Sequence, residues 1–370
     1  MEIPIYLYIF FASFLVSYLL VPIIRRFALR FDIVDHPGER KVHQKVKPLL
    51  GGLAIYLAFT VVVLGSIAGL LSLGKHPLGG HLLSGMISQV PGLLLVLPKL
   101  LALLLGGTMM AFIGILDDVK GVNFSPKLKF AGQILCALVL VGFGVHTTFM
   151  PSHLLNVLIT VLWIVGISNS FNLLDNMDGL SGGTCLISSL LFFLVAHIQG
   201  QFFTALILLA LSGAVLGFLR YNFFPSRIFM GDTGSLFIGF ILGSLTVITS
   251  YVTEESTSLL PVVMPILILG VPLFDTFSVI YIRLAEGRPI FKGDKCHFSH
   301  RLCDLGMSHV QAVLFIYAVA ICVGISALLL PTLNGWESIL VLIQAGVIFG
   351  LIVVLMVVGK KDAQKWGKGS

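Results

Sequence analysis

The sequence carries very little charge for its length. Only 11% of its 370 residues are Asp, Glu, Lys or Arg, whereas 57% are hydrophobic, and the mean hydropathy is +1.03. A soluble domain carries about 25% charged residues, so this composition excludes an ordinary soluble protein. The apolar runs are continuous and lack the alternation of a transmembrane β-barrel. The sequence therefore predicts an all-α, polytopic membrane protein in which residues 1–370 form a single integral-membrane domain.

Cysteine is also scarce, and no secretory signal stands out. Cys296 and Cys303 lie in a polar stretch, the other three of the five cysteines lie in apolar runs, and no pair suggests a disulfide framework. In the first apolar run, residues 5–21, the basic cluster follows the run instead of preceding it. A cleaved signal has the opposite order, so we expect this run to be retained as the first membrane helix.

Long apolar runs recur along the whole chain. Most are close to the roughly 20 residues that a bilayer requires, and the fifth is short. Residues 73–93 are punctuated by Gly and Pro, and we expect them to form a loop or a re-entrant, surface-lying segment. The eleven expected spans are 3–24, 49–72, 94–116, 130–147, 153–168, 182–199, 202–219, 236–252, 259–282, 311–330 and 336–358.

Lysine and arginine are distributed unevenly between the loops. With eleven spans, 21 of the 23 lysines and arginines fall on one side of the membrane, and only Lys75 and Lys99 fall on the other. Basic loops stay in the cytoplasm, so the N-terminus is predicted outside and the C-terminus inside. The net charge of +6 is then a topology signal, and we expect no nucleic-acid partner. The cytoplasmic loops expected to form a site are 25–48, 117–129, 169–181, 220–235 and 283–310.

The stretch NSFNLLDNMDGL places two carboxylates and three carboxamides between two apolar runs. If it is helical, the spacing of Asn172, Asp175 and Asn176 puts them on one face. Such hard oxygen ligands suit Mg²⁺, which also takes phosphate oxygens. The alternative is a polar loop in which Asn and Asp side chains cap helix ends. Five such side chains in ten residues exceed what capping requires, so we favour a site for a metal ion.

Three further carboxylates lie at predicted helix ends on the same side. Asp117 and Asp118 directly follow a long apolar run, where adjacent carboxylates repel each other and oppose the helix dipole. Asp232 lies between two glycines just before an apolar helix. These residues are compatible with solvated acids at a helix end and with a capped turn. They are equally compatible with carboxylates aimed at the same metal ion.

Several cations also belong to the predicted cytoplasmic side. His297, His300 and Arg301 lie close together in a polar loop, where a cationic cluster would face phosphates. A Cys/His zinc site there would need unusual ligand spacing, and attraction of the loop to anionic lipid headgroups is a further alternative. Lys127 and Lys129 open a helix near the membrane surface and would bind a lipid phosphate, unless they act only as topology signals.

One carboxylate is expected within the membrane. Asp275 lies about two turns inside the ninth span, where an acidic side chain is functional or paired, and Arg283 is a candidate partner. Together, the cytoplasmic loops bring carboxylates, cations and glycines to one membrane surface. This combination suits a metal-dependent reaction on phosphates with a lipid substrate that arrives from the bilayer.

From about residue 30 to 305, the chain resembles the polyprenyl-phosphate N-acetylhexosamine-1-phosphate transferase family, of the glycosyltransferase family 4 type. The segments similar to motifs of that family are RKVHQKVKPLLGGLAI, GILDDVKG with SPKLKFAGQ, NSFNLLDNMDGLSGG, NFFPSRIFMGDTGSLFIG and HFSHRL. An eleven-span topology with the N-terminus outside also agrees with the family. The chain departs from the family pattern at Ser299, where a histidine is common, at Asn176, where a glycine is common, and at Ser226, which replaces an alanine.

The resemblance implies roles for individual residues. It implies that Asn172 and Asp232 hold Mg²⁺ (or Mn²⁺) against a diphosphate, and that Asp178 bonds a uracil on which Phe229 stacks. The other residues that it implies in catalysis are Asp117, Asp118, Asp175, His297 and His300, and the other substrate-binding residues are Lys127, Lys129, Asn222 and Arg301.

The reaction implied is transfer of N-acetylhexosamine 1-phosphate from a UDP-sugar to polyprenyl (undecaprenyl) phosphate, with release of UMP. The triple-His form of the branch that uses UDP-MurNAc-pentapeptide is absent, so the pattern looks more like the UDP-GlcNAc branch. The resemblance implies the cytoplasmic membrane, with the active site on its cytoplasmic face, and leaves a homodimer open. An ion-coupled transporter or lipid flippase is the alternative of another class; it would have carboxylates at mid-membrane and inverted repeats.

Overall fold

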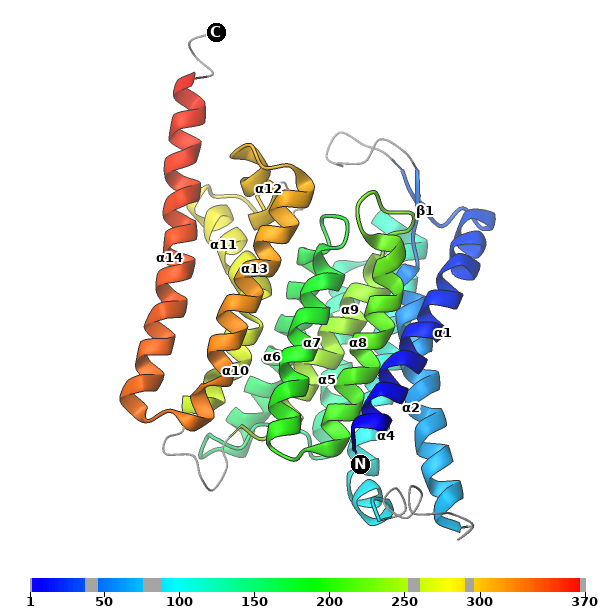
Figure 1. The fold of residues 1–370 in the computed structure, drawn as a ribbon. Helices are drawn as coiled ribbons and strands as arrows, with labels where there is room; N and C mark the ends of the chain where they lie inside the picture. The colour runs from blue at the N-terminus through cyan, green and yellow to red at the C-terminus, as the bar shows by residue number, and fades with distance from the viewer. Residues whose placement is uncertain (1, 37–45, 76–87, 252–259, 290–295, 367–370) are drawn as a thin grey trace.

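The structure of the protein is a computed structural model, which describes residues 2–36, 46–75, 88–251, 260–289 and 296–366 (Figure 1). Helices dominate it, as the apolar runs predict. The long and short helices are α1 (Glu2–Arg30), α2 (Gly51–Lys75), α4 (Val90–Lys120), α5 (Pro126–Gly142), α6 (His153–Leu174), α7 (Leu180–Ile198), α8 (Phe202–Asn222), α9 (Gly231–Ile248), α10 (Met264–Ile268), α11 (Gly270–Ala285), α12 (Phe298–Asp304), α13 (His309–Leu328) and α14 (Gly335–Trp366).

Short elements join some of these helices. Strands β1 (Val34–Asp35) and β2 (Lys47–Pro48) pair antiparallel, with Asp35 opposite Lys47. Three short 3₁₀ helices are present as well: η1 (Gly121–Asn123), η2 (Leu260–Val263) and η3 (Leu330–Thr332). The arrangement is all-α in the described residues apart from this two-residue ladder, which confirms the predicted fold class.

Each of the eleven expected spans contains a helix or a helix pair. Nine described helices are long and apolar enough to cross a membrane, and Leu260–Ile268 with Gly270–Ala285, bent by 72°, make a tenth if they form one broken span. Of the helices in the eleven expected spans, α5 is the one outside this set, and it has 17 residues. The expectation that the fifth span is short was wrong. Helix α6 has 22 residues, because it continues beyond its apolar run to Leu174.

The segment expected to be a loop or a surface-lying element, residues 73–93, is described only at its ends. Helix α2 continues to Lys75, and α4 begins at Val90 with Pro91 in its first turn, where proline is well tolerated. Residues 76–87 lie outside the described part of the chain, so the two expectations for this segment remain predictions.

Helices α8 and α9 form the centre of the bundle. The most apolar window of α9 is 83% buried and that of α8 is 78% buried, whereas the values are 28% for α1 and 22% for α14. Helix α9 packs against α2, α4 and α6, and α8 packs against α1, α2 and α7. The peripheral position of α14 is plain in Figure 1, where it stands at one edge of the bundle.

Glycines allow the backbones around the start of α9 to approach closely. A Cβ added at Gly52 in α2 would lie 2.0 Å from the Cα of Gly234, and one added at Gly114 in α4 would lie 2.4 Å from the Cα of Thr233. Close backbone approach through small residues is a common way of packing membrane helices. Here it holds the first turn of α9 against both α2 and α4.

The same end of the bundle contains most of the polar loops. Figure 1 shows β1, α12 and the C-terminal end of α14 at one end, and the N-terminal end of α1 at the other. The opposite positions of these helix ends agree with an odd number of crossings, as eleven spans require. Which end faces the cytoplasm remains a prediction from the charge distribution.

Gly52→Ala should destabilise the protein, because the added methyl group would overlap the backbone of Gly234. Overpacking costs about 1–3 kcal/mol, so we expect the Tm in detergent to fall by about 1–4 °C. Gly69→Ala is the matched control in the same helix, since nothing lies within 4 Å of its added Cβ. Its Tm should stay the same or rise slightly. Equal Tm values for the two variants would contradict the close crossing.

Candidate active site

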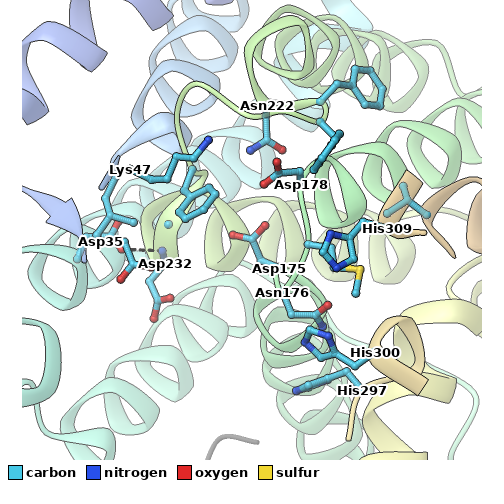
Figure 2. Close-up of a pocket in the computed structure, with 18 of the residues that line it drawn as sticks. Asp35, Lys47, Asp175, Asn176, Asp178, Asn222, Asp232, His297, His300 and His309 are labelled. Carbon is cyan, nitrogen blue, oxygen red and sulfur yellow. Dashed lines mark hydrogen bonds between the residues drawn. The ribbon is translucent and has the colours of Figure 1, made fainter. Parts of the chain in front are cut away.

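A cavity of about 1270 Å³ opens at the end of the bundle that contains the polar loops. Figure 2 shows Asp232, Asp175 and Asp178 turned toward the same space, with Asn176 lying between Asp175 and His300. The predicted site residues that line the cavity are Asp117, Asp118, Asp175, Asp178, Asn222, Phe229, Asp232, His297 and His300. Segments that lie far apart in the sequence therefore meet at one site, as the motifs predicted.

Asp118 anchors the N-terminus of α9. Its Oδ1 accepts a hydrogen bond from the Asp232 backbone N–H (2.8 Å), and its Oδ2 accepts bonds from the Thr233 N–H (3.0 Å) and hydroxyl (2.6 Å). A carboxylate is stabilised at a helix N-terminus by the free N–H groups and the helix dipole. The unfavourable position of Asp118 near the end of α4 is therefore compensated by the start of α9.

Gly231 makes this contact possible. Its φ of 72° lies in the left-handed region, and a Cβ at this position would lie 2.5 Å from Oδ2 of Asp118. Only glycine meets both requirements without strain. The glycine before Asp232, which the sequence suggested was a turn residue, thus brings the α9 backbone onto the Asp118 carboxylate.

Asp117, the other carboxylate of the pair, has a cation for its partner. The Lys129 ammonium donates to Oδ2 of Asp117 (2.7 Å), to Oδ1 of Asn172 (3.4 Å) and to Asp232. Asn172 also donates through Nδ2 to Asp232 Oδ1 and to the Ser235 hydroxyl, both at 2.9 Å. One ammonium group therefore links residues of α4, α6 and α9.

These contacts test whether the residues fit a divalent cation. No group of three or more His, Cys, Asp or Glu side chains in the described ranges is arranged as a metal site. The oxygens of Asp117, Asp232 and Asn172 nevertheless converge on a single cation, the Lys129 ammonium. Two carboxylates and a carboxamide are the hard donors that Mg²⁺ takes, with substrate phosphate completing the shell. The donor set fits such an ion, provided that the ammonium moves aside.

The stretch with two carboxylates is a helix end followed by a tight loop. Helix α6 ends at Leu174, so Asn172 lies in its last turn and Asp175 is at its C-cap. Gly179, with a φ of 78°, is the N-cap residue of α7. The stretch is therefore not helical throughout, and Asp175 and Asn176 follow the helix instead of continuing its face. Gly179, in the left-handed region that glycine adopts without strain, is the turn residue from which the next helix begins.

Asp178 and Asn222 hold this loop against the segment before α9. Oδ2 of Asp178 accepts a hydrogen bond from the Ser226 N–H (2.8 Å). The buried Asn222 side chain accepts from the Gly179 N–H (3.0 Å) and donates to the Ile228 carbonyl (3.0 Å). Asn222 thus joins two loops by hydrogen bonds. This contact gives it a structural role in addition to the substrate binding that the resemblance implies.

Burial and neighbouring carboxylates change the acidity of Asp175. Burial is the main cause that raises the pKa of Asp175 well above its ordinary value, and Asp232, Asp118 and Asp178 raise it further by repulsion. Opposing this repulsion requires added positive charge, which a metal ion or a cationic side chain supplies. The concentration of carboxylates therefore makes this part of the cavity a place for cations.

A buried carboxylate orients the imidazole of His297. Oδ2 of Asp275 contacts Nδ1 of His297 at 2.8 Å, and Oδ1 accepts the Phe298 N–H. Arg283 was the expected partner of Asp275. The two carboxylate oxygens instead bind His297 and Phe298, the first residue of α12. Asp275 was a site residue that the sequence indicated only as an intramembrane acid. Next to it, burial and then the nearby His297 lower the pKa of His300.

The structure places the three predicted basic binding residues in different surroundings. Lys127 is exposed at the start of α5 and does not line the cavity. Arg301 donates to the Ser278 hydroxyl, which turns it toward α11. Lys129 binds the carboxylates described above. The sequence placed all three by type and neighbourhood, and the direction of each side chain depends on packing that the sequence does not display.

Some residues that line the cavity were not predicted. Lys47 of β2 binds the Ser226 carbonyl and hydroxyl, and its ammonium lies 5.9 Å from the centre of the Phe229 ring. Tyr317 of α13 donates its hydroxyl to the Gly179 carbonyl. The basic residues before α2 gave a signal for Lys47, although residues 37–45 of that loop lie outside the described part. Nothing in the apolar sequence around Tyr317 distinguished this residue from one that only packs in the hydrophobic core.

The fold and site describe a helical membrane protein with a polar cavity at one end, and comparison with known proteins identifies its family. The sequence profile of glycosyl transferase family 4 matches residues 100–250. The "Probable undecaprenyl-phosphate N-acetylglucosaminyl 1-phosphate transferase" of Bacillus subtilis is 35% identical over 360 residues, which is 95% of this chain and 90% of the relative. The chain belongs to this family, and the resemblance indicated by its motifs is confirmed.

Two other relatives show the breadth of the family. The "Decaprenyl-phosphate N-acetylglucosaminephosphotransferase" of Mycolicibacterium smegmatis is 32% identical over 82% of this chain and 76% of the relative. The "Phospho-N-acetylmuramoyl-pentapeptide-transferase" of Bacillus thuringiensis is 29% identical over 85% of this chain and 93% of the relative. The chain is thus similar to relatives named for two different sugars.

The two adjacent aspartates should respond differently to loss of charge. Asp118→Asn replaces an acceptor of the α9 N–H groups, and a charge-assisted hydrogen bond contributes about 1.5–3 kcal/mol. We expect its Tm to fall by at least about 3 °C. Asp117→Asn has one ammonium partner that is partly exposed, so its Tm should change little. Thermal unfolding in detergent measures both, and equal losses of Tm would rule out the anchoring role of Asp118.

Proposed function

We propose that the protein transfers N-acetylhexosamine 1-phosphate, most favourably GlcNAc 1-phosphate, from a UDP-sugar to polyprenyl (undecaprenyl) phosphate. The observation that carries this proposal is one cavity at one end of a membrane bundle, where carboxylates, Lys47 and two histidines from separate segments of the chain converge. The names of the relatives in Bacillus subtilis and Mycolicibacterium smegmatis support the same reaction. The product would be the lipid-linked sugar that starts a cell-envelope polysaccharide.

In the proposed reaction, an oxygen of the lipid phosphate attacks the β-phosphorus of the UDP-sugar. A new phosphorus–oxygen bond forms to the lipid, and the bond to the UMP oxygen breaks, so UMP leaves with the electron pair. Phosphoryl transfer depends mainly on positioning and on neutralising the charge of the phosphates. The proposal assigns uracil contacts to Asp178 and Phe229, and contacts with the sugar or diphosphate to His297 and His300.

The proposed cofactor is Mg²⁺, with Mn²⁺ as a substitute. Asn172 and Asp232 would hold it, together with Asp117, because their oxygens already converge on one cation. When bound, the ion would supply positive charge to the diphosphate. Lys129 is well placed to take the lipid phosphate once it leaves these carboxylates, since it lies at the start of α5 near the membrane surface.

We further propose that the enzyme lies in the cytoplasmic membrane with this site on the cytoplasmic face. The support is the charge distribution, in which 21 of 23 basic residues fall on the site's side. A nucleotide sugar would then arrive from the cytosol and the lipid from the bilayer. The proposal does not require the homodimer that the resemblance leaves open, because the residues assigned above all belong to one chain.

One assay separates this proposal from the UDP-MurNAc-pentapeptide alternative and from the transporter or flippase alternative. The purified protein is incubated with undecaprenyl phosphate and, separately, UDP-GlcNAc, UDP-GalNAc and UDP-MurNAc-pentapeptide, and UMP release is measured with and without EDTA. We expect release with UDP-GlcNAc and its loss in EDTA. Release with UDP-MurNAc-pentapeptide alone would favour the second sugar, as the relative in Bacillus thuringiensis is named. No UMP from any donor would favour the transporter or flippase class.

Asp232→Asn and Asp117→Asn should each lower kcat by at least about a hundredfold, the scale of losing one electrostatic stabiliser. Both keep the shape of the side chain and remove a negative charge that would face the metal and the phosphates. UMP release under saturating substrates measures the effect. Gly69→Ala, remote from the cavity, is the matched control and should retain wild-type turnover. Near-wild-type kcat in either aspartate variant would remove that residue from the site.

The raised pKa of Asp175 predicts that metal binding depends on pH. Below this pKa the carboxyl group is neutral, and above it the group adds a negative charge near the proposed ligand Asp232, so metal affinity should increase as pH rises through the pKa. We expect the Tm increase caused by Mg²⁺ to become larger as pH rises through the pKa of Asp175. The side chain in Asp175→Asn cannot ionise, so its Tm increase should vary less with pH. An identical pH dependence in the variant would contradict the assignment.

A further inference from the structure

A hydrogen bond between two side chains joins the short helix α12 to the loop of residues 175–179 between α6 and α7, which is called the acidic loop below. The Ser299 hydroxyl donates to Oδ1 of Asn176 at 2.6 Å, although the two residues are 123 positions apart in the chain. Ser299 is 1% exposed, so this contact is shielded from water on the α12 side. A buried hydroxyl without a partner is costly, which makes the bond a fixed feature of the packing.

Each partner is held in its place by a second set of contacts. Nδ2 of Asn176 donates to the Leu173 carbonyl at 2.8 Å, so the orientation of the amide is set and Oδ1 is left to face Ser299. Helix α12 is fixed independently, because Asp275 binds His297 and the Phe298 N–H. Phe298 and Leu302 are fully buried. The bond therefore joins two rigid parts, and its loss should not unfold either one.

The position of the bond connects the two sides of the cavity. Ser299 lies between His297 and His300 in sequence, and Asn176 lies between Asp175 and Asp178. All four of these neighbours line the cavity. Under the proposed function, the acidic loop contacts the nucleotide end of the donor, and the histidines contact its sugar or diphosphate. The bond then sets the distance between the groups that hold the two ends of one substrate.

We propose that Ser299 and Asn176 are positioning residues, whose hydrogen bond fixes the histidine helix relative to the acidic loop and so determines binding of the nucleotide-sugar donor. This inference rests on the proposed function. It concerns two of the three positions at which the chain departs from the motif pattern that it resembles, and the structure brings these two residues into contact. The lipid phosphate, which the proposed function places at Lys129, should be indifferent to the bond.

The test measures KM for UDP-GlcNAc and for undecaprenyl phosphate separately. Ser299→Ala removes only the hydroxyl, and we expect kcat/KM for the donor to fall about threefold to tenfold, the value of one net hydrogen bond. The KM for undecaprenyl phosphate should remain unchanged. Ser299→Thr keeps the hydroxyl and should restore most of the donor kcat/KM. Ser189→Ala removes another buried hydroxyl, which contacts Ser212 at 2.7 Å in the bundle, and should alter neither KM.

A double-mutant cycle shows whether the two side chains act through each other. If they do, Ser299→Ala combined with Asn176→Ala should lower the donor kcat/KM no further than Asn176→Ala alone. Independent, additive losses would overturn the proposal, as would a Ser299→Ala enzyme that loses activity with both KM values unchanged, because that outcome reports only fewer folded molecules. Wild-type behaviour of Ser299→Ala would overturn it as well.

The same cycle, measured by thermal unfolding of the unliganded protein, separates this inference from the proposed function. A wild-type protein that releases no UMP from any donor contradicts the proposed function and the donor-binding part of the inference. Coupling of the two substitutions in Tm would still support the link between α12 and the acidic loop. Absence of that coupling would overturn the link even in an active transferase.

Discussion

The site depends first on the carboxylate of Asp118 at the N-terminus of α9. Its three hydrogen bonds bring together the end of α4 and the start of α9, and Asp232 lies in that first turn. Glycines on α2, α4 and α9 remove the side chains that would keep the backbones apart. With α9 fixed, Asn172 reaches Asp232 from α6, and Lys129 of α5 reaches both Asp232 and Asp117. The chemistry of the cavity is thus built on one contact between a carboxylate and a helix end.

Composition and motifs predicted much of this arrangement. Apolar runs indicated a helical membrane bundle, and nine helices with a bent pair agree with it. The paired and isolated aspartates were expected on one side, and Asp117, Asp118, Asp175 and Asp232 all line one cavity. This success has a physical basis, since acidic side chains in so apolar a chain are stable only at its polar ends or with partners. Their types therefore carried information about their place.

The directions of side chains could not be predicted in the same way. Lys127 and Lys129 are two positions apart, yet one is exposed and the other binds two aspartates, because the face of α5 that packs is set by its neighbours. Arg301 turns toward Ser278, and Asp275 binds His297 instead of the arginine on its own helix. Ser299 and Asn176 differ from the motif pattern at separate places, and nothing in the sequence indicates that they touch. Such facts require the tertiary fold.

The contact between Asp118 and Thr233 spans 115 residues, which has a consequence for how the protein is made. As the chain leaves the ribosome, α4 enters the membrane well before α9 has been synthesised. Until then, Asp118 lacks the two N–H groups and the hydroxyl of α9 that it binds in the folded protein. The functional end of the protein is completed late in insertion, when α9 and then α12 join helices already in the bilayer. A chain interrupted before α9 would therefore lack Asp232 and the groups that hold Asp118, although Asp117, Lys129 and Asn172 would already be present.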